Sequence, residues 1–371
     1  MAVDDLWYLS RKDDGGLRIP SSRHGRGKRW RVRYTDPNGR DQTRAFDLKG
    51  DAERFDVKVR SDVVRGEYVE ANRLTVRDYA EQWRAMQPHR PNTASGAKSR
   101  LERHLYPALG GRPIAAVRPS EVQAFVAGLS LAPGSVRTLM ATVSAVFAAA
   151  VQDRLIVRDP TDGIKLPAVM RAKVVPLAVE AVDALIAALP PRYRALGIVA
   201  AGTGMRQGEL FGLQVRDVDF LRRVVRVERQ VQPSGVGPLK NRAAYRAIPV
   251  GATVIDALAA HLAVYPSDGF VFRTAAGEPL HRHRMKVPWD MARREAGLPD
   301  AGMHDLRHFY ASALIRAGLS VKVVSERLGH SNAAMTLNVY SHLWPDDEDR
   351  TRQAIDGLFA PTPHDRLRSV P

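Results

Sequence analysis

The stretch Thr203-Gly204-Met205-Arg206-Gln207-Gly208-Glu209-Leu210 sets one arginine between two glycines and a glutamate three residues after it. Glycine has no Cβ, so the backbone on either side of Arg206 can approach a ligand closely. A carboxylate at this spacing can hold the guanidinium group through an ion pair. The stretch therefore predicts a site at which Arg206 binds an anion and Glu209 supports it.

Two further clusters lie downstream and carry the same kind of chemistry. In the segment 304–308 (His-Asp-Leu-Arg-His), His304 and Arg307 would share one face of a helix, so both can point at one phosphate. The segment 328–330 (Leu-Gly-His) is followed by an apolar helical pattern that ends at Tyr340. Together the clusters predict a basic, histidine-rich site in the last 200 residues.

These clusters, in this order, resemble the catalytic boxes of the tyrosine recombinase family, of phage-integrase type. The spacing fits that family: 101 residues separate Arg206 from Arg307, and 33 more lead to Tyr340. The resemblance is strong over residues 170–345 and weaker over 73–168.

Between the clusters, the segments 238–241 (Pro-Leu-Lys-Asn) and 246–249 (Arg-Ala-Ile-Pro) look like the family's β-hairpin with its catalytic lysine. The resemblance implies that Tyr340 is the nucleophile of a 3′-phosphotyrosyl intermediate and that Lys240 is the general acid. It implies supporting contacts from Glu209 and no cofactor or metal. The complete set of implied catalytic residues is Arg206, Lys240, His304, Arg307, His330 and Tyr340.

The identity of residue 240 agrees with the proton transfer that the resemblance assigns to it. Arginine outnumbers lysine 46 to 10 in this chain, yet a lysine stands at the position that must release a proton. An arginine side chain, with a pKa above about 12, cannot do so, whereas the pKa of a desolvated lysine can fall toward neutrality. The bias toward arginine thus supports Lys240 as the general acid.

The overall composition indicates a polyanionic partner. The 371 residues include 56 Lys and Arg against 40 Asp and Glu, a formal net charge of +16, which is typical of proteins that bind nucleic acid. No run approaches the ~20 apolar residues of a membrane span, and the first residues do not read as a signal peptide. With no cysteine there is no disulfide or thiolate site. We expect a cytoplasmic, nucleoid-associated protein without a membrane partner.

Residues 1–70 predict a small sheet with a helix. The segment 29–34 alternates basic and apolar residues, as a half-buried strand does, and a turn near residue 37 precedes a second strand. The segment resembles the arm-type DNA-binding domain of three-domain integrases, although a solvated charged sheet would have the same pattern. The predicted DNA contacts here are Arg29, Arg31 and Arg33.

The rest of the chain predicts two further domains. Residues 73–160 are expected to form an all-helical (SAM-like) core-binding domain in which Lys98, Arg100 and Arg103 contact DNA. An ordinary helical bundle would have the same sequence pattern. A proline-rich linker is predicted at 161–176 and a flexible tail at 361–371. Residues 177–360 are expected to form a mixed, mainly α-helical catalytic domain with a small antiparallel sheet. The fold class is thus multidomain α/β.

The resemblance implies a site-specific recombinase that integrates, and with a directionality factor excises, a phage or mobile element. Its implied partners are double-stranded core and arm DNA, three further copies in a homo-tetramer, a host DNA-bending factor and an excision factor. One alternative is a non-catalytic DNA-binding regulator. Another is a zinc hydrolase built on His304 and His308, although the third ligand is missing and Asp305 is shorter than the glutamate such motifs use. Against the zinc alternative, we expect His308 to be a buried residue with a structural hydrogen bond.

Overall fold

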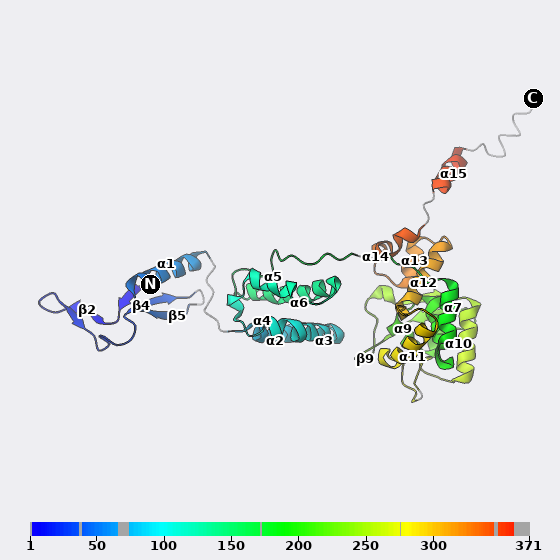
Figure 1. Cartoon of the computed structure of the whole chain (residues 1–371), viewed down its shortest axis with the longest axis horizontal. Coiled ribbons are helices and arrows are strands. Elements are labelled where there is room, and N and C mark those ends of the chain that lie inside the picture. Colours follow the sequence, from blue (N-terminus) through cyan, green and yellow to red (C-terminus); the bar gives the residue numbers. More distant parts are fainter. Residues whose placement is uncertain are drawn as a thin grey trace, which may run out of the picture. The chain divides into compact units, whose positions relative to one another are not determined.

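The computed structural model describes residues 2–36, 39–65, 74–170, 173–274, 276–344 and 348–359. The chain forms two compact units, residues 1–170 and 171–371, whose parts are drawn in Figure 1. The predicted tail, 361–371, lies outside the described residues.

The N-terminal residues form a small antiparallel sheet with a helix on it. Val32, in the middle of the central strand, is fully buried, while Arg31 and Arg33 project from the other face, as the alternating pattern predicts. A second hairpin precedes that strand and was not expected. The elements are β1 (Ala2–Asp5), β4 (Trp30–Thr35) and β5 (Asp41–Phe46) in the order β1-β4-β5, the hairpin β2 (Tyr8–Lys12) and β3 (Arg18–Pro20), and α1 (Lys49–Val64).

Residues 74–170 form a helical bundle around one apolar core. Thr75 caps the first helix by accepting a hydrogen bond from the Asp78 backbone N–H. The longest helix, α6, is also long and apolar enough to cross a membrane, but many of its apolar side chains line the bundle core, as expected for a core helix. The helices are α2 (Val76–Met86), α3 (Pro91–Arg100), the π-helical turn η1 (Leu101–Leu105), α4 (Tyr106–Leu109), the 3-10 turn η2 (Ile114–Ala116), α5 (Pro119–Ala127) and α6 (Pro133–Gln152).

The second unit is mixed and mainly helical, with small antiparallel sheets. Its helices are α7 (Val179–Ala188), α8 (Pro191–Thr203), α9 (Gln207–Phe211), α10 (Ala252–Val264), α11 (Arg282–Glu295), α12 (Met303–Arg316), α13 (Val321–Leu328), α14 (Ala333–Tyr340) and α15 (Glu348–Phe359), with 3-10 turns at η3 (Val215–Asp217), η4 (Arg242–Ala244) and η5 (Ser341–Leu343). Its strands are β6 (Val218–Asp219), β7 (Val224–Val227) and β10 (Arg246–Pro249) in the order β10-β7-β6, and the hairpin β8 (Gln230–Gln232) and β9 (Gly235–Gly237). One apolar core unites most of these elements.

The helical path of the chain is interrupted just before Arg206. Helix α8 ends at Thr203, Gly204 adopts a left-handed conformation (φ 60°), and α9 begins only at Gln207. A Cβ on Gly204 would lie 2.4 Å from Cδ1 of Tyr310, so the chain reverses here against α12 at a distance that only glycine permits. The break places Arg206 at the start of α9 rather than inside a helix.

The helical bundle generates a stability prediction. Phe147 of α6 is fully buried, so Phe147→Ala should destabilise the bundle by about 3–5 kcal/mol through lost burial and the cavity left behind. Hydrogen–deuterium exchange should show the loss of protection in residues 74–166. Met86→Ala, at a residue that is 67% exposed, is the control and should change little; equal effects of both would contradict the core assignment.

Candidate active site

Three arginines converge on the C-terminal end of α13. Each donates to one of three successive backbone carbonyls, where a helix leaves its acceptors unpaired and its dipole is negative. The bonds are Arg246 Nε to Arg327 O (2.7 Å), Arg307 Nη2 to Leu328 O (2.6 Å) and Arg206 Nη2 to Gly329 O (3.3 Å). The predicted Leu-Gly-His cluster thus contributes backbone acceptors as well as His330.

Gly329 makes this arrangement possible. It ends α13 in the left-handed conformation (φ 65°), which turns the chain away from the helix axis. A Cβ here would lie 2.8 Å from Nη1 of Arg246 and 3.1 Å from the carbonyl oxygen of Ala243. A larger residue would therefore displace the Arg246 guanidinium group.

Glu209 is the carboxylate at the centre of the arginines. It is 2% exposed, its Oε1 accepts from Arg206 Nη1 at 2.9 Å, and its Oε2 accepts from Arg246 Nη2 at 2.9 Å. Burial alone would raise the pKa of Glu209, but the charge and hydrogen bond of Arg246, with the charge of Arg206, hold that pKa below its usual range. Glu209 thus stays ionised and compensates two cations.

Arg307 is the most buried of the arginines, at 2% exposed. Besides Leu328 it donates to the carbonyl of Gly204 at 2.7 Å, so two carbonyls from different segments fix its orientation. Burial, then the nearby charge of Arg206, lowers the pKa of Arg307 to about 9. The group is still a cation at neutral pH, and an incoming anion would relieve the cost of keeping it charged.

Two histidines of the site are uncharged at neutral pH. Desolvation lowers the pKa of His304 to about 4, reinforced by His308 and Arg307. Desolvation, then the charges of Arg307 and Arg206, lowers the pKa of His330 to about 4. His330 Nδ1 lies 2.8 Å from the hydroxyl of the fully buried Thr336. Each neutral ring carries one donor nitrogen and one acceptor nitrogen, and in His330 the nitrogen that is left for a ligand is Nε2.

Tyr340 ends α14 and is almost fully enclosed, at 2% exposed. Its hydroxyl lies 2.7 Å from Nδ1 of His308, the residue after Arg307 on α12. Burial raises the pKa of Tyr340 to about 12, although the charge of Arg307 opposes the rise. The hydroxyl is therefore protonated in this structure.

Of the predicted site residues, the structure brings together Arg206, Glu209, Arg307 and His330 around the end of α13, with His304 and Tyr340 beside them. Lys240 is placed differently. It is exposed in the segment after β9, and among the described residues no hydrogen bond or ion pair joins it to this cluster. Its part in the site stays a prediction.

The predicted arm-domain arginines lie on the N-terminal sheet and are paired with acids. Arg31 Nη2 and Arg33 Nε both contact Asp4 Oδ2, at 3.0 and 2.9 Å. Arg29 Nη2 contacts Asp5 Oδ2 at 2.9 Å. Sequence reasoning did not anticipate that β1 would bring two aspartates beside this strand.

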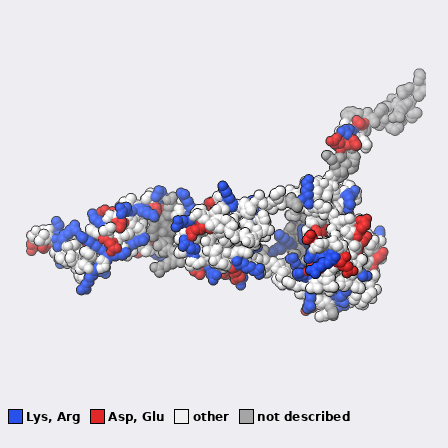
Figure 2. All heavy atoms as spheres, in the orientation of Figure 1, with Lys and Arg blue, Asp and Glu red and all other residues white. Residues whose placement is uncertain are grey.

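The predicted basic residues of the helical bundle lie on α3 and η1. Lys98 Nζ is 3.7 Å from Glu102 Oε1, and Arg100 Nε donates to Thr142 Oγ1 at 3.1 Å. Arg100 and Arg103 line a pocket of about 400 Å³ together with Ser135 and other residues of α6. Figure 2 shows basic side chains on the visible surface of both the sheet and the bundle.

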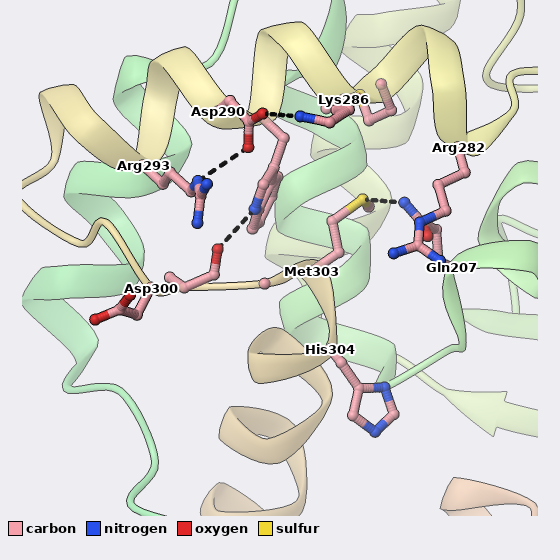
Figure 3. Close-up of a pocket in the computed structure, with 12 residues that line it drawn as sticks. Gln207, Arg282, Lys286, Asp290, Arg293, Asp300, Met303 and His304 are labelled. Carbon is pink, nitrogen blue, oxygen red and sulfur yellow. Dashed lines mark hydrogen bonds and ion pairs between the residues drawn. The ribbon is translucent and has the colours of Figure 1, made fainter. Parts of the chain in front are cut away.

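A pocket of about 560 Å³ adjoins the arginine cluster (Figure 3). Helix α11 supplies Arg282 and Lys286, α9 supplies Gln207, and α12 supplies His304. In Figure 3 the side chains of Arg282 and Gln207 lie close together. Basic side chains thus continue from the cluster onto α11, where Asp290 pairs with Lys286 at 2.6 Å.

Sequence reasoning missed two residues of the cluster. Arg246 appeared only as part of a strand, and its burial depends on α13, which lies about 80 residues away in the sequence. His308 appeared as a structural residue, and nothing in its spacing predicts a bond to Tyr340. The histidine pair does not form a zinc site with neighbours: among the described residues no group of three or more His, Asp or Glu side chains is placed to hold a metal.

Two family profiles match the chain. The profile of the phage integrase family matches residues 168–346, and that of the phage integrase central domain matches residues 76–166. The tyrosine recombinase XerC of Mycobacterium sp. (strain KMS) is 32% identical over 234 residues, which cover 57% of this chain and 74% of that protein. The integrase of Mycobacterium phage L5 is 27% identical over 285 residues, covering 74% and 76%. A tyrosine recombinase XerC-like protein of Caldanaerobacter subterraneus is 31% identical over 195 residues. This match covers 45% of this chain and half the length of that relative.

Solved structures with the same fold include two integrases bound to DNA. One is the Tn1549 transposon integrase with transposon right end DNA, at a TM-score of 0.65 and 23% identity, covering 77% of this chain and all of that one. The other is a lambda integrase tetramer bound to a Holliday junction, at a TM-score of 0.60 and 18% identity, covering 81% and 93%. At these identities the likeness establishes the fold alone.

The arginine cluster generates a prediction for Arg246. Removing one partner of a buried pair leaves an uncompensated charge, so Arg246→Leu should destabilise the protein by about 3–5 kcal/mol. Because the folded-state pKa of Glu209 is depressed, its ionisation stabilises the fold above the ordinary carboxyl range, and that stability is lost as the pH falls through the folded pKa. Without Arg246 this loss should begin at a higher pH in acid unfolding.

The matched control is Arg226→Leu. Arg226 contacts Asp219 at 3.8 Å with 46% of its side chain exposed, so its removal should cost no more than about 1 kcal/mol. Glu209→Gln in the Arg246→Leu background should recover part of the loss. Equal destabilisation by the two arginine variants would contradict the role given to the buried pair.

Proposed function

The chain belongs to the phage integrase family and is a site-specific tyrosine recombinase, and on this basis we propose that it integrates a phage or other mobile element through a covalent bond to Tyr340. The observation that carries the proposal is the geometry around α13. Arg206 and Arg307 are fixed by backbone carbonyls beside a buried tyrosine, with two neutral histidines nearby. A non-catalytic DNA-binding regulator would use the basic surface but has no need of this cluster.

The arginines act on the scissile phosphate. A pentavalent phosphoryl transition state carries negative charge on its non-bridging oxygens, and the free N–H groups of Arg206 and Arg307 donate to them. Glu209 orients Arg206, and His304 and His330 add hydrogen bonds to the phosphate. Because the donors are held in place before DNA binds, little reorganisation opposes the reaction.

The covalent step balances without a metal or cofactor. The Tyr340 oxygen bonds to phosphorus while its proton passes to a base of the site, the bond to the 5′ oxygen breaks, and a 3′-phosphotyrosyl link remains. Lys240 supplies the proton to the leaving 5′ oxygen. Attack by a DNA hydroxyl later reverses the step and rejoins the strands. Since Lys240 lies on an exposed segment, DNA binding must carry it to the leaving group.

The proposed domain roles follow the order of the family. Residues 1–70 bind arm DNA, 73–160 bind the core site, and 161–176 link them to the catalytic residues 177–360. Four copies assemble on two DNA sites, with a bending factor and an excision factor setting the direction. The protein acts in the cytoplasm, at the nucleoid. The DNA-bound and tetrameric assemblies of the fold relatives support these proposals.

The proposed DNA contacts are Arg29, Arg31, Arg33, Lys98, Arg100 and Arg103. The acids beside the first three reduce their net charge, so Asp4 limits how strongly the sheet face attracts phosphates. Arm binding would therefore depend on DNA contacts that replace the Asp4 pairs. The bundle residues Arg100 and Arg103 have no such acid among their described contacts.

Tyr340→Phe tests the catalytic proposal. On a suicide duplex bearing the core site from the DNA that flanks the gene, the native chain should form a covalent protein–DNA adduct, and Tyr340→Phe should form none because the nucleophilic oxygen is gone. The adduct is measured by denaturing gel electrophoresis, and EDTA should not reduce it. Failure of the native chain to form an adduct on this site, or loss of the adduct in EDTA, would contradict the proposal.

Asp4→Asn tests the sheet face. Freeing Arg31 and Arg33 should tighten binding to duplex DNA and steepen the slope of log K against log salt by roughly one, as expected for one more phosphate contact. Fluorescence anisotropy at several salt concentrations measures both. The control Asp51→Asn changes the same charge beside Arg54 on α1 and should have a smaller effect. Equal salt slopes for the two variants would contradict the role given to Asp4, because net charge alone would then determine DNA binding.

A further inference from the structure

The hydroxyl of Tyr340 has a specific partner that the mechanism above does not use. His308 Nδ1 lies 2.7 Å from it, and the two rings are 5.5 Å apart at 66°. Among the described residues, His308 is the one hydrogen-bond partner of this hydroxyl. Tyr340 and His308 belong to the same chain and to helices α14 and α12, so the pair is complete within one protomer.

The roles of donor and acceptor follow from the surroundings. Desolvation, aided by the charge of Arg307, lowers the pKa of His308, so the ring is neutral and one nitrogen is an acceptor. A phenol O–H buried with Tyr340 needs an acceptor. The arrangement that satisfies both groups has the tyrosine donating to Nδ1, with the histidine proton on Nε2.

We propose that His308 is the general base of the cleavage step and takes the proton of Tyr340 as its oxygen attacks phosphorus. The proposal rests on the proposed function, because it assigns a role within the same reaction. It makes His308 a catalytic residue, since its Nδ1 touches the reacting oxygen.

The proton balance of the step is complete. As the Tyr340 oxygen forms its bond to phosphorus, its proton passes to Nδ1 and His308 becomes an imidazolium. The bond from phosphorus to the 5′ oxygen breaks, and Lys240 protonates that oxygen. On rejoining, His308 returns its proton to the departing tyrosine, so one residue serves as base in one direction and as acid in the other.

The site favours this transfer only once DNA is bound. Before binding, burial and the charge of Arg307 disfavour a charged His308 and outweigh the opposing charge of Asp305. A scissile phosphate held by Arg206 and Arg307 adds a negative charge next to the ring and makes the imidazolium less costly. His304, whose ring stacks edge-on against His308 at 4.8 Å, occupies the next turn and has no recorded bond to Tyr340.

The test compares two substitutions in the full-length chain. His308→Asn places an acceptor oxygen near the position of Nδ1 but cannot take the proton, whereas His308→Leu removes both functions. If His308 is a base, both variants should slow adduct formation by roughly 10²–10⁴-fold, the usual contribution of such a group. Single-turnover cleavage of the suicide duplex measures the rate, and DNA affinity and thermal unfolding check that both variants are folded.

A second substrate separates His308 from the leaving-group acid. Sulfur in place of the bridging 5′ oxygen leaves readily without a proton, so this duplex should rescue Lys240→Ala. It should rescue neither His308 variant, because their defect lies at the nucleophile. Sulfur rescue of His308→Asn would overturn the proposal by placing the residue at the leaving group.

Two other results would also overturn it. A native rate for His308→Asn would reduce His308 to a hydrogen-bonding, positioning residue, and a faster rate for His308→Leu would make it a restraint on the nucleophile. These outcomes are distinct from failure of the proposed function, in which the native chain itself forms no adduct at Tyr340.

Discussion

The constraint on which the catalytic unit depends is the need to hold three guanidinium groups close together with little water. Like charges at such distances repel, and each N–H removed from water needs an acceptor. The end of α13 meets both needs by offering three carbonyls and a negative dipole, and Glu209 adds a full negative charge between two of the arginines. The remaining N–H groups of Arg206 and Arg307 are the ones that we propose for a phosphate.

This constraint explains why distant parts of the chain meet at one point. The break after α8 presents Arg206, strand β10 presents Arg246, and helix α12 presents Arg307. Gly204 and Gly329 allow the close approach of these elements at two positions where a side chain would collide with Tyr310 or Arg246. The small sheet and the surrounding helices can thus be understood as the frame that brings the three arginines to α13.

The sequence predicted most of the site because its chemistry is carried by short motifs. Arg206 with Glu209, His304 with Arg307, and His330 with Tyr340 each lie within eleven residues. In the structure Arg206 pairs with Glu209, and the charge of Arg307 acts on His304, His330 and Tyr340. The sequence could not reveal Arg246 or the partner of Tyr340, because those contacts depend on packing between helices and strands far apart in sequence. The pairing of β1 with the predicted DNA-binding strand could not be predicted for the same reason. It places Asp4 beside Arg31 and Arg33, with which Asp4 forms ion pairs. Lys240 lies on an exposed segment, so its part in the site stays a prediction.

The central claim is that carbonyl-anchored arginines hold a phosphate opposite Tyr340. The most direct measurement is a crystal structure of the full chain with its core duplex, nicked at the cleavage position, and orthovanadate. We expect vanadate to be bonded to the Tyr340 oxygen, with Arg206 and Arg307 donating hydrogen bonds to its equatorial oxygens. Arg307 should keep its hydrogen bonds to the carbonyls of Gly204 and Leu328. Vanadate bound away from Tyr340, or an Arg307 released from both carbonyls, would contradict it.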